Sequence, residues 1–419
     1  MRDIFLRRQP IFTRRLEVWG YEIVAGRFGL LERESSSVPQ TGPLPAVPVS
    51  SVQVVTEEAR LLLDALTEIG LPALVGKAPA VFRLAPQAAL ALQDVLPALL
   101  SPDRLIPFLV VEHETDQAQL EAALAALRTH GFRIGLSGCL AVPEFLPLAR
   151  TVDLVAVSAR DRTLEELAAL VTGLRAGRAQ ILVTDIEDYE TFDRCRELRV
   201  AFFSGSFLAV PRPVRGSRTP SNRALLLLLA RLQDPEVEFS ELEALISLDV
   251  GLTYRLLRLV NSVWYGRRRI DSIRQALLLL GTRLVSAWVT LLLMADIPDK
   301  PHELLTTAVI RARMAELLAA ARGRASRESA FLVGLLSVLD ALLDQPMEEI
   351  LAALPLAEEL EHALASREGE LGAILEAVLA YERGDWARAA SLGLRPSLLT
   401  SSYLDALALA REIDLALAA

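Results

Sequence analysis

Apolar residues in the first half of the chain come in short runs that alternate with stretches of helical period. Apolar runs occupy residues 3–6, 17–24, 80–84, 106–111, 132–136, 152–157, 181–184 and 200–203. The run at 152–157 is almost unbroken, which is typical of a parallel strand covered on both faces. Between the runs, segments such as 118–129 and 164–174 carry apolar residues three and four positions apart. About eight strands alternating with helices over roughly 200 residues predict an α/β fold, a TIM-like (β/α) barrel.

The second half shows helical periodicity alone. Leu252, Leu256 and Leu259 fall on one face of a predicted helix. Two pairs, Ser240 with Glu243 and Ser272 with Gln275, have the spacing of a capping box and predict helix starts. This half is therefore expected to be all-α.

Two domains follow from this change of pattern. Proline, glycine and serine make up half of residues 211–220, which predicts a connector. We expect a barrel over residues 1–206 and a helical domain with a C-terminal helical extension over residues 207–419. Residues 32–53 are rich in serine and proline without an apolar period, and predict a mobile insertion in the barrel.

Composition and charge narrow the classes of function. The chain is 52% hydrophobic, which excludes global disorder, and its net charge of −9 argues against non-specific binding to nucleic acid. The two cysteines, Cys139 and Cys195, are too few for a disulfide framework and favour a reducing compartment. The most membrane-like run, residues 276–297, contains Arg283 near its middle and predicts two buried helices joined by a turn. We expect a cytoplasmic protein with no export signal and no membrane span.

Two motifs in the second half point to a family. Residues 245–262 read LISLDVGLTYRLLRLVNS, and residues 270–281 read IDSIRQALLLLG. Together they resemble the signature of HD-related output domains, abbreviated HDOD. The resemblance implies an all-helical HDOD domain.

The first half resembles the EAL phosphodiesterase family, in the form that is fused to output domains. The resemblance rests on RQPIF at residues 8–12, on GYE at residues 20–22 and on Phe203, Gly205, Phe207 and Pro211. The sequence YERGDW at residues 381–386 resembles the tail of the same fused proteins. The resemblance implies an EAL-type barrel and a role related to cyclic di-GMP.

The EAL resemblance also implies a pair of divalent cations held by carboxylates, and most of these ligands are replaced here. Glu22, Glu112 and Glu187 match the family's glutamates. Elsewhere Arg83 replaces an asparagine, Ser137 and Gly138 a pair of aspartates, Ala156 a lysine, Ser158 an aspartate and Thr184 a glutamate. Because each hard cation takes about six oxygen ligands, we expect no metal, no other cofactor and no phosphodiesterase activity, with the remaining residues forming a remnant cleft.

The helical domain also lacks the ligands of HD phosphohydrolases. Residues 335–338, where the His–Asp pair is expected, read LLSV, and no two of the four histidines stand at helical ligand spacing. We therefore predict that neither domain is an enzyme.

These residues lead to a catalytically inactive signalling scaffold as the predicted function. The helical domain is expected to contact other signalling proteins through a surface that contains Arg255, Arg258, Asn261, Arg267, Arg268 and Arg269. Self-association is a further expectation, and nucleic acid is not an expected partner. The alternative is a sensor that binds cyclic di-GMP without hydrolysis, with Arg83 contacting phosphate.

Overall fold

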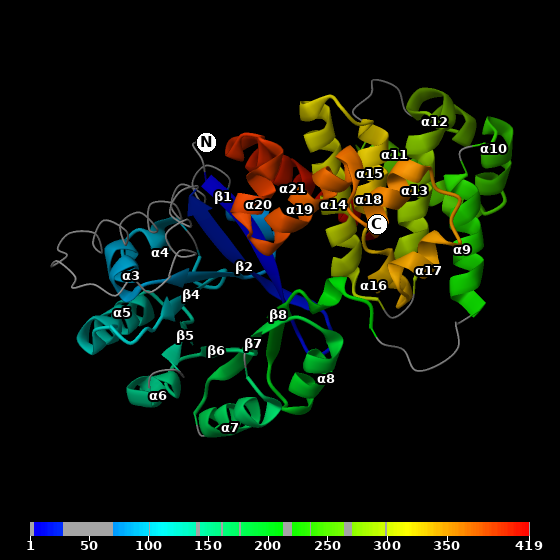
Figure 1. Ribbon diagram of the computed structural model, residues 1–419. Coiled ribbons are helices and arrows are strands. Elements are labelled where there is room, and N and C mark those ends of the chain that lie inside the picture. Colours follow the sequence, from blue (N-terminus) through cyan, green and yellow to red (C-terminus); the bar gives the residue numbers. More distant parts are fainter. Residues whose placement is uncertain are drawn as a thin grey trace, which may run out of the picture. The chain divides into compact units, whose positions relative to one another are not determined.

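The computed structural model divides into two compact units, Met1–Phe207 and Leu208–Ala419, which are described one at a time (Figure 1). It describes residues 4–27, 70–99, 101–139, 143–160, 162–175, 177–212, 220–234, 236–263, 270–297 and 300–418. The predicted insertion at residues 32–53 lies outside the described residues.

The first unit is a closed barrel with the strand order β1-β2-β3-β4-β5-β6-β7-β8, as the alternation of apolar runs predicts. Its strands are β1 (Ile4–Phe12), β2 (Val18–Arg27), β3 (Ala80–Leu84), β4 (Leu105–Val110), β5 (Gly135–Ser137), β6 (Leu154–Ser158), β7 (Gln180–Ile186) and β8 (Phe202–Gly205). Helical segments of this unit are α2 (Leu71–Val75), α3 (Pro86–Leu92), α4 (Leu96–Leu99), α5 (Gln117–Thr129), η2 (Pro143–Phe145), α6 (Leu146–Ala149), α7 (Leu164–Leu174) and α8 (Tyr189–Glu197). A 3₁₀ turn, η3 (Phe207–Ala209), crosses the division between the units.

One strand departs from the parallel pattern. β1 pairs antiparallel with both β2 and β8, while the other neighbours pair in parallel. A tight turn between β1 and β2 makes these two strands antiparallel. In this turn the backbone N–H of Thr13 donates to Glu17 O, and that of Leu16 donates to Thr13 O. β1 and β2 therefore form a hairpin instead of two strands joined by a crossover helix.

The barrel interior is filled by apolar side chains from six of these strands. They are Ile11, Val81, Ile106, Phe108, Leu154, Ala156, Leu182 and Phe202. Trp19 stacks on Phe202 with ring centroids 4.1 Å apart. The interior is a packed core rather than a pore, which leaves the strand ends as the place for chemistry.

The described part of the second unit is helical, as its apolar periodicity predicts. Its elements are α9 (Pro220–Gln233), α10 (Phe239–Ser247), α11 (Val250–Val263), α12 (Ile273–Leu280), α13 (Thr282–Ala295), α14 (His302–Arg322), α15 (Arg327–Leu336), α16 (Leu339–Leu343), α17 (Met347–Leu351), α18 (Glu358–Ala365), α19 (Gly369–Arg383), α20 (Trp386–Ala389), η4 (Ala390–Leu392) and α21 (Pro396–Ala418). The long helix α14 packs against α15, α19 and α21 and forms the centre of the unit.

Of the two serines predicted to cap helices, Ser272 does so and Ser240 does not. Ser272 caps α12 by accepting a hydrogen bond from the backbone N–H of Gln275 (3.1 Å). The Ser240 cap is wrong, because α10 already begins at Phe239 and Glu238 takes the N-cap position without a side-chain bond. Residues 276–297 form parts of two helices separated at Gly281, whose φ of 82° suits glycine. None of the helices among the described residues has the length and apolar character needed to cross a bilayer.

Candidate functional site at the barrel mouth

Polar side chains gather at the carboxyl-terminal ends of the barrel strands. Val81, Ala156 and Leu182 belong to the barrel core, and side chains two positions later in a strand point the same way. Arg83, Ser158 and Thr184 therefore also face the interior, one pleat further along β3, β6 and β7. This edge of a (β/α) barrel is where such folds place their active sites.

Glu22 and Ser137 join this group from β2 and β5. Glu22 stands opposite the core residue Val81 in the parallel register of β2 and β3. Gly135 lies against the Phe108 ring, where a Cβ atom would be 2.5 Å from the ring, so Ser137 two positions later also points inward. We call Glu22, Arg83, Ser137, Ser158 and Thr184 the barrel mouth.

Glu22 and Arg83 form an ion pair inside the barrel mouth. The Arg83 Nε atom lies 2.6 Å from Glu22 Oε1, and Nη2 donates to Oε2 at 3.3 Å. The Glu22 side chain is 10% exposed, whereas that of Arg83 is 43% exposed. The guanidinium thus neutralises the buried carboxylate and keeps an accessible edge for an anion.

The other two predicted cleft residues, Glu112 and Glu187, make no described contact with this pair. Glu112 is exposed just beyond β4, and its backbone N–H donates to Thr115 Oγ1 (2.8 Å). The Glu187 side chain is 69% exposed and lies 3.9 Å from Arg160 Nε. The described contacts connect neither of them to Glu22, so the structure brings together two of the four predicted residues.

Sequence reasoning missed Asp185, a carboxylate at the end of β7. The register of β7 against β8 shifts between Val183 and Ile186, and Asp185 has a φ of 58°. Its Oδ2 atom accepts hydrogen bonds from Ser158 Oγ (2.6 Å) and Thr184 Oγ1 (3.1 Å). The EAL resemblance gives residue 184 as the position of a family glutamate and gives no role to residue 185. The register shift that orients Asp185 leaves no signal in the sequence.

Glu22 in the barrel mouth and Asp185 beside it do not fit a pair of divalent cations. Across the described ranges, no three His, Cys, Asp or Glu side chains lie close enough to hold a metal ion. Glu22, the best buried of these carboxylates, already has a guanidinium 2.6 Å away. A cation there would have to displace a positive group, so no chemical step is assigned to a metal.

The two cysteines are buried free thiols. Burial raises the pKa of Cys139 to about 11, and that of Cys195 also to about 11. Both thiols are protonated at neutral pH, and only the thiolate is a good nucleophile. Neither is a candidate for covalent catalysis.

The predicted interaction surface of the helical unit divides into separate environments. Arg255 pairs with Asp296 through bonds of 2.5 and 2.6 Å. Arg258 is half-buried, and its Nη2 atom is buried without a described hydrogen bond. Asn261 joins α11 to the start of the next segment, because its amide donates to Leu257 O and Ile270 O and accepts from Ile270 N. Arg267, Arg268 and Arg269 lie outside the described residues, and the surface stays a prediction.

The place expected for a His–Asp pair is taken by an arginine network. The Arg311 side chain, 6% exposed, makes two bonds to Glu382 of 2.7 and 2.9 Å. Its Nη1 atom also donates to Ser337 Oγ at 3.3 Å. The buried, positively charged guanidinium of Arg311 therefore lies at the centre of the helical unit, beside residues 335–338.

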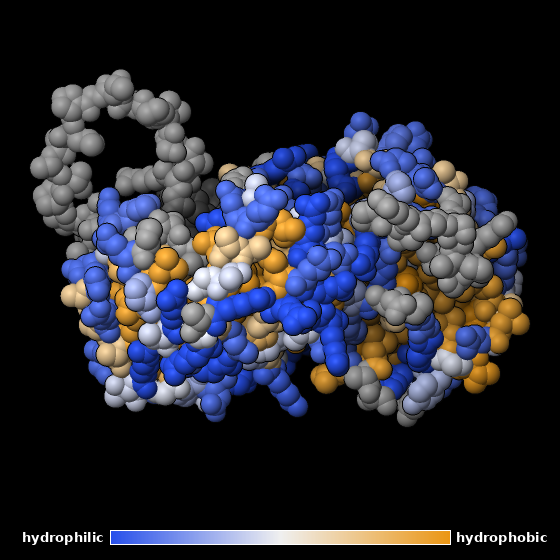
Figure 2. Space-filling view, turned by 90° about the horizontal axis from the view of Figure 1, so that it is seen from below, coloured by the Kyte–Doolittle hydropathy of each residue, from blue (hydrophilic) through white to orange (hydrophobic). Residues whose placement is uncertain are grey.

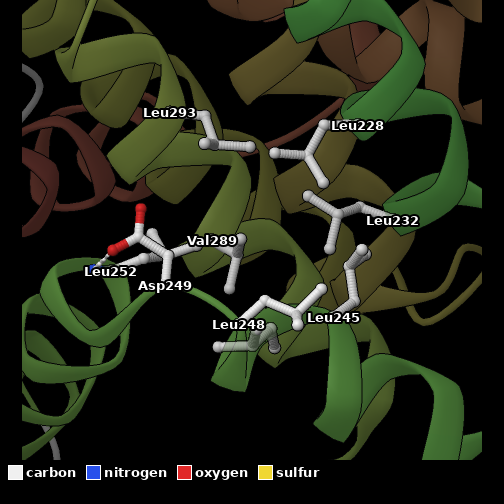
Figure 3. Close-up of a pocket in the computed structure, with 9 residues that line it drawn as sticks. Leu228, Leu232, Leu245, Leu248, Asp249, Leu252, Val289 and Leu293 are labelled. Atoms are coloured by element: carbon white, nitrogen blue, oxygen red, sulfur yellow. Dashed lines mark hydrogen bonds between the residues drawn. The ribbon is translucent and has the colours of Figure 1, made fainter.

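An apolar pocket opens in the helical unit. Its lining is Leu228, Leu232, Leu245, Ile246, Leu248, Asp249, Leu252, Val289 and Leu293. Figure 3 shows the leucine side chains converging, with Asp249 turned to the backbone N–H of Leu252 (3.0 Å). Figure 2 shows hydrophobic residues, coloured orange, on the visible face of this unit at the right of the view. Leu248 is 83% exposed. An apolar lining with one carboxylate does not suit a phosphorylated ligand, so the barrel mouth is the better candidate.

Comparison with known proteins finds one matching domain family and two similar proteins. Residues 220–381 match the family model of the HDOD domain. The chain is 32% identical over 270 residues to "Cyclic di-GMP phosphodiesterase CdgJ" of Vibrio cholerae, a match that spans 63% of this chain and 62% of that relative. The chain thus matches less than two thirds of the length of that relative. It is also 25% identical over 418 residues to "Uncharacterized protein YuxH" of Bacillus subtilis, spanning 96% of this chain and 97% of the relative.

Solved structures give weaker matches. The Bacillus subtilis YkuI protein, with an EAL domain and in complex with cyclic di-GMP and calcium, has a TM-score of 0.37 and 18% identity, covering 66% of this chain and 73% of that chain. Klebsiella pneumoniae BlrP1 in a manganese and cyclic di-GMP complex has a TM-score of 0.38 and 16% identity, covering 49% of this chain and 55% of that chain. At these scores the likeness carries no argument.

The expectation of a catalytically inactive scaffold is wrong, and so is that of a sensor without hydrolysis. The finding against both is the 32% identity with a protein named a phosphodiesterase. The prediction compared residue types at the family's motif positions alone. A register shift in β7 interrupts the alternation of its side chains, and the carboxylate of Asp185 accepts hydrogen bonds from Ser158 and Thr184, two positions that were counted as having lost a carboxylate.

The HDOD match and the barrel geometry together settle what the chain contains. The match lies wholly within the helical unit, and the barrel precedes it in the sequence. The chain therefore contains an HDOD domain over residues 220–381, preceded by a closed eight-stranded barrel.

Proposed function

We propose that this chain is a cyclic di-GMP phosphodiesterase of bacterial signalling, with an EAL-type barrel whose mouth binds the dinucleotide. The observation that carries the proposal is the 32% identity over 270 residues with a protein named a cyclic di-GMP phosphodiesterase. The position of the barrel mouth supports it, because enzymes built on such barrels bind substrate over the carboxyl-terminal strand ends.

Arg83 is the residue best suited to hold a phosphate of the dinucleotide. Its planar guanidinium is fixed by two contacts to Glu22, and its side chain remains 43% exposed. Arginine binds phosphate oxygens through paired N–H donors, which gives both strength and orientation. The phosphodiester would thus be fixed next to the carboxylate of Glu22.

We also propose where the protein is located and which partners it has. We place the protein in the cytoplasm, because both cysteines are free thiols and a reducing compartment keeps them so. Other signalling proteins as partners of the helical unit, and self-association, stay predictions. The exposed side chains of Leu248 and Tyr254, 83% and 65% accessible, support a contact surface on that unit.

The test is a turnover assay on the full chain. Purified protein is incubated with cyclic di-GMP in buffer with Mg²⁺ or Mn²⁺, and the linear dinucleotide is measured by chromatography. We expect product from the natural sequence, none from Glu22→Gln, and full activity from Glu17→Gln. Glu17 is a matched control because it is exposed at the hairpin turn, outside the barrel mouth. Absence of product from the natural sequence refutes the proposal.

A further inference from the structure

We propose that the apolar pocket of the helical unit is the docking groove for a basic amphipathic helix of a partner protein. Apolar side chains of that helix enter the pocket, and its lysine or arginine side chains face the acidic residues around it. The inference rests on the proposal that the helical unit has protein partners, and it does not depend on the phosphodiesterase activity proposed for the barrel. Its basis is the lining of the pocket together with the charges beside it.

The pocket lies where four helices of the unit meet. Its apolar helical lining comes from α9 (Leu228 and Leu232), α10 (Leu245 and Ile246), α11 (Leu252) and α13 (Val289 and Leu293). The labelled side chains of these helices converge on one hollow (Figure 3). Its volume is about 230 Å³, below the roughly 300–1,000 Å³ of pockets that enclose small ligands. The pocket therefore fits a few side chains of a partner better than a whole substrate or cofactor.

Exposed apolar side chains continue from the pocket onto the surface beside it. Leu248 lines the pocket and is 83% exposed. Leu227 adjoins the lining residue Leu228 and is 64% exposed. Val250 adjoins the lining residue Asp249 and is 81% exposed. Exposed apolar side chains that adjoin an apolar pocket are typical of interaction sites, so we interpret this surface as a place where a partner binds.

The surface beside the pocket is acidic. Residues 232–254 supply most of the lining, and they contain six aspartate or glutamate residues and no lysine, arginine or histidine. Asp249 itself lines the pocket and is exposed. Glu241 is exposed on α10 one helical turn before Leu245, and residues four apart lie on the same face of a helix. Carboxylates thus lie on the same side of the unit as the apolar lining.

The positive charges beside the pocket do not balance these carboxylates. Arg231 Nη1 lies 3.8 Å from Glu241 Oε1 and 3.9 Å from Asp234 Oδ2, so one guanidinium is shared by two carboxylates without a hydrogen bond to either. Arg255 bonds to Asp296 at 2.5 and 2.6 Å, and this pair adds no net charge. We define the acidic rim as Asp234, Glu241 and Asp249, which together with Arg231 carry a net charge of −2.

The acidic rim fits a partner that carries positive charge next to its apolar side chains. An amphipathic helix has both, because apolar residues three and four positions apart face the groove while lysine or arginine residues flank them. The described part of this unit is helical and offers no strand edge with which an extended segment could pair. A basic amphipathic helix is therefore the occupant that the groove and the rim favour together.

The same charges disfavour two other occupants. A second copy of this chain, bound through the same face by two-fold symmetry, would place one acidic rim against another. A membrane would bring anionic headgroups to the acidic rim. Both arrangements oppose like charges, whereas a basic helix gains from the attraction of opposite charges.

The test is calorimetric titration of the full chain with two synthetic helical peptides. Both have leucine at the same positions, three and four residues apart, and the flanking positions are lysine in one peptide and glutamate in the other. Leu248→Glu places a charge in the groove and should fold normally, because Leu248 is 83% exposed. Leu415→Glu is the matched control, because Leu415 is 70% exposed on α21 and does not line the pocket. The two variants have equal net charge, so non-specific attraction cannot distinguish them.

Asp249→Asn tests the acidic rim separately. Asparagine caps a helix about as well as aspartate does, so this variant should keep the hydrogen bond from the backbone N–H of Leu252 and lose the charge. Its affinity for the lysine peptide should fall about 2- to 5-fold, the effect of one exposed ion pair. The difference from the natural sequence should shrink at high salt, because salt screens exposed charges.

We expect the lysine peptide to bind the natural sequence in the micromolar range and the glutamate peptide to bind at least about 10-fold more weakly. Leu248→Glu should weaken binding of the lysine peptide at least about 10-fold, and Leu415→Glu should leave it unchanged. Equal affinity for the two peptides, equal affinity of the two variants, or no binding of the lysine peptide overturns the inference.

Two further measurements distinguish the other occupants. Sedimentation in which Leu248→Glu dissociates a dimer of the natural sequence, without peptide binding, would assign the groove to a second copy and overturn the inference. Binding to phosphatidylglycerol vesicles that Leu248→Glu abolishes, again without peptide binding, would assign the groove to a membrane and overturn it too. A partner crosslinked to another face of the helical unit would overturn the groove and leave the proposal of protein partners standing. The turnover assay of the barrel is independent of all these outcomes.

Discussion

Removing Glu382 tests whether the buried arginine network holds the helical unit together. Glu382 makes both of its bonds to Arg311, whose side chain is 6% exposed and lies on the central helix α14. Glu382→Ala leaves a buried guanidinium with Ser337 as its remaining described hydrogen-bond partner. Breaking a buried ion pair in this way costs about 3–5 kcal/mol.

The structure moderates this magnitude. The Glu382 side chain is 40% exposed, so part of its attraction for Arg311 is screened by water. We therefore expect about 3 kcal/mol, the lower end of that range. For a unit of roughly 200 residues this corresponds to a melting temperature lower by about 6–12 °C.

Calorimetry on the full chain measures this effect in the transition of the helical unit. Arg274→Ala is the control in the same unit, because Arg274 is 70% exposed and lies 3.9 Å from Glu243, a pair worth less than about 1 kcal/mol. The double variant Arg311→Met with Glu382→Leu should recover much of the loss, since apolar packing replaces an ion pair well. A loss below about 1 kcal/mol in Glu382→Ala would refute the view that this pair stabilises the unit.

Two further predictions concern binding and pH. Arg83→Ala should weaken cyclic di-GMP affinity about 10- to 100-fold by calorimetry, because a hydrogen bond to a charged group contributes about 1.5–3 kcal/mol; equal affinity would exclude Arg83 from the site. The hydrogen bond that the protonated His302 donates to Asp414 raises the pKa of His302 above 6.5, so the stability that this pair contributes is present below pH 6.5 and is lost as the pH rises through the raised pKa. The His302 side chain is 60% exposed and that of Asp414 is 36% exposed, so water screens the pair. Asp414→Ala should therefore lower the free energy of unfolding by less than about 1 kcal/mol at pH 6, and by still less at pH 9. Urea titrations at the two pH values measure this difference, and an equal loss at both would contradict the prediction.

Local patterns predicted much of the architecture. Strands and helices in the barrel, the helical second half and the break at Gly281 were visible in apolar spacing and turn residues. The Ser272 cap was also predictable, because it joins residues three positions apart. Ser240 failed as a cap because α10 begins at Phe239, two residues before the start that a Ser240 cap would give, and capping residues mark a helix end only within one or two positions.

The candidate site was predicted in part. Glu22 and Arg83 were both expected in the cleft, and they do lie together. Their ion pair was not expected, because the two residues are 61 positions apart and meet only when β2 and β3 are paired. Asp185 was missed altogether, since its orientation depends on how β7 is registered against β8.

The sequence by itself determined which segments become strands and helices, because side-chain alternation and helical period are properties of neighbouring residues. It also determined that the second half carries the HDOD signature. Only the tertiary structure decided which polar side chains meet. Closure of the barrel pairs Glu22 with Arg83, a register shift turns Asp185 to Ser158, and helix packing joins Arg311 to Glu382 across 71 positions. Such contacts arise from strand register and helix packing, which join residues far apart in the chain and leave no periodic trace along it.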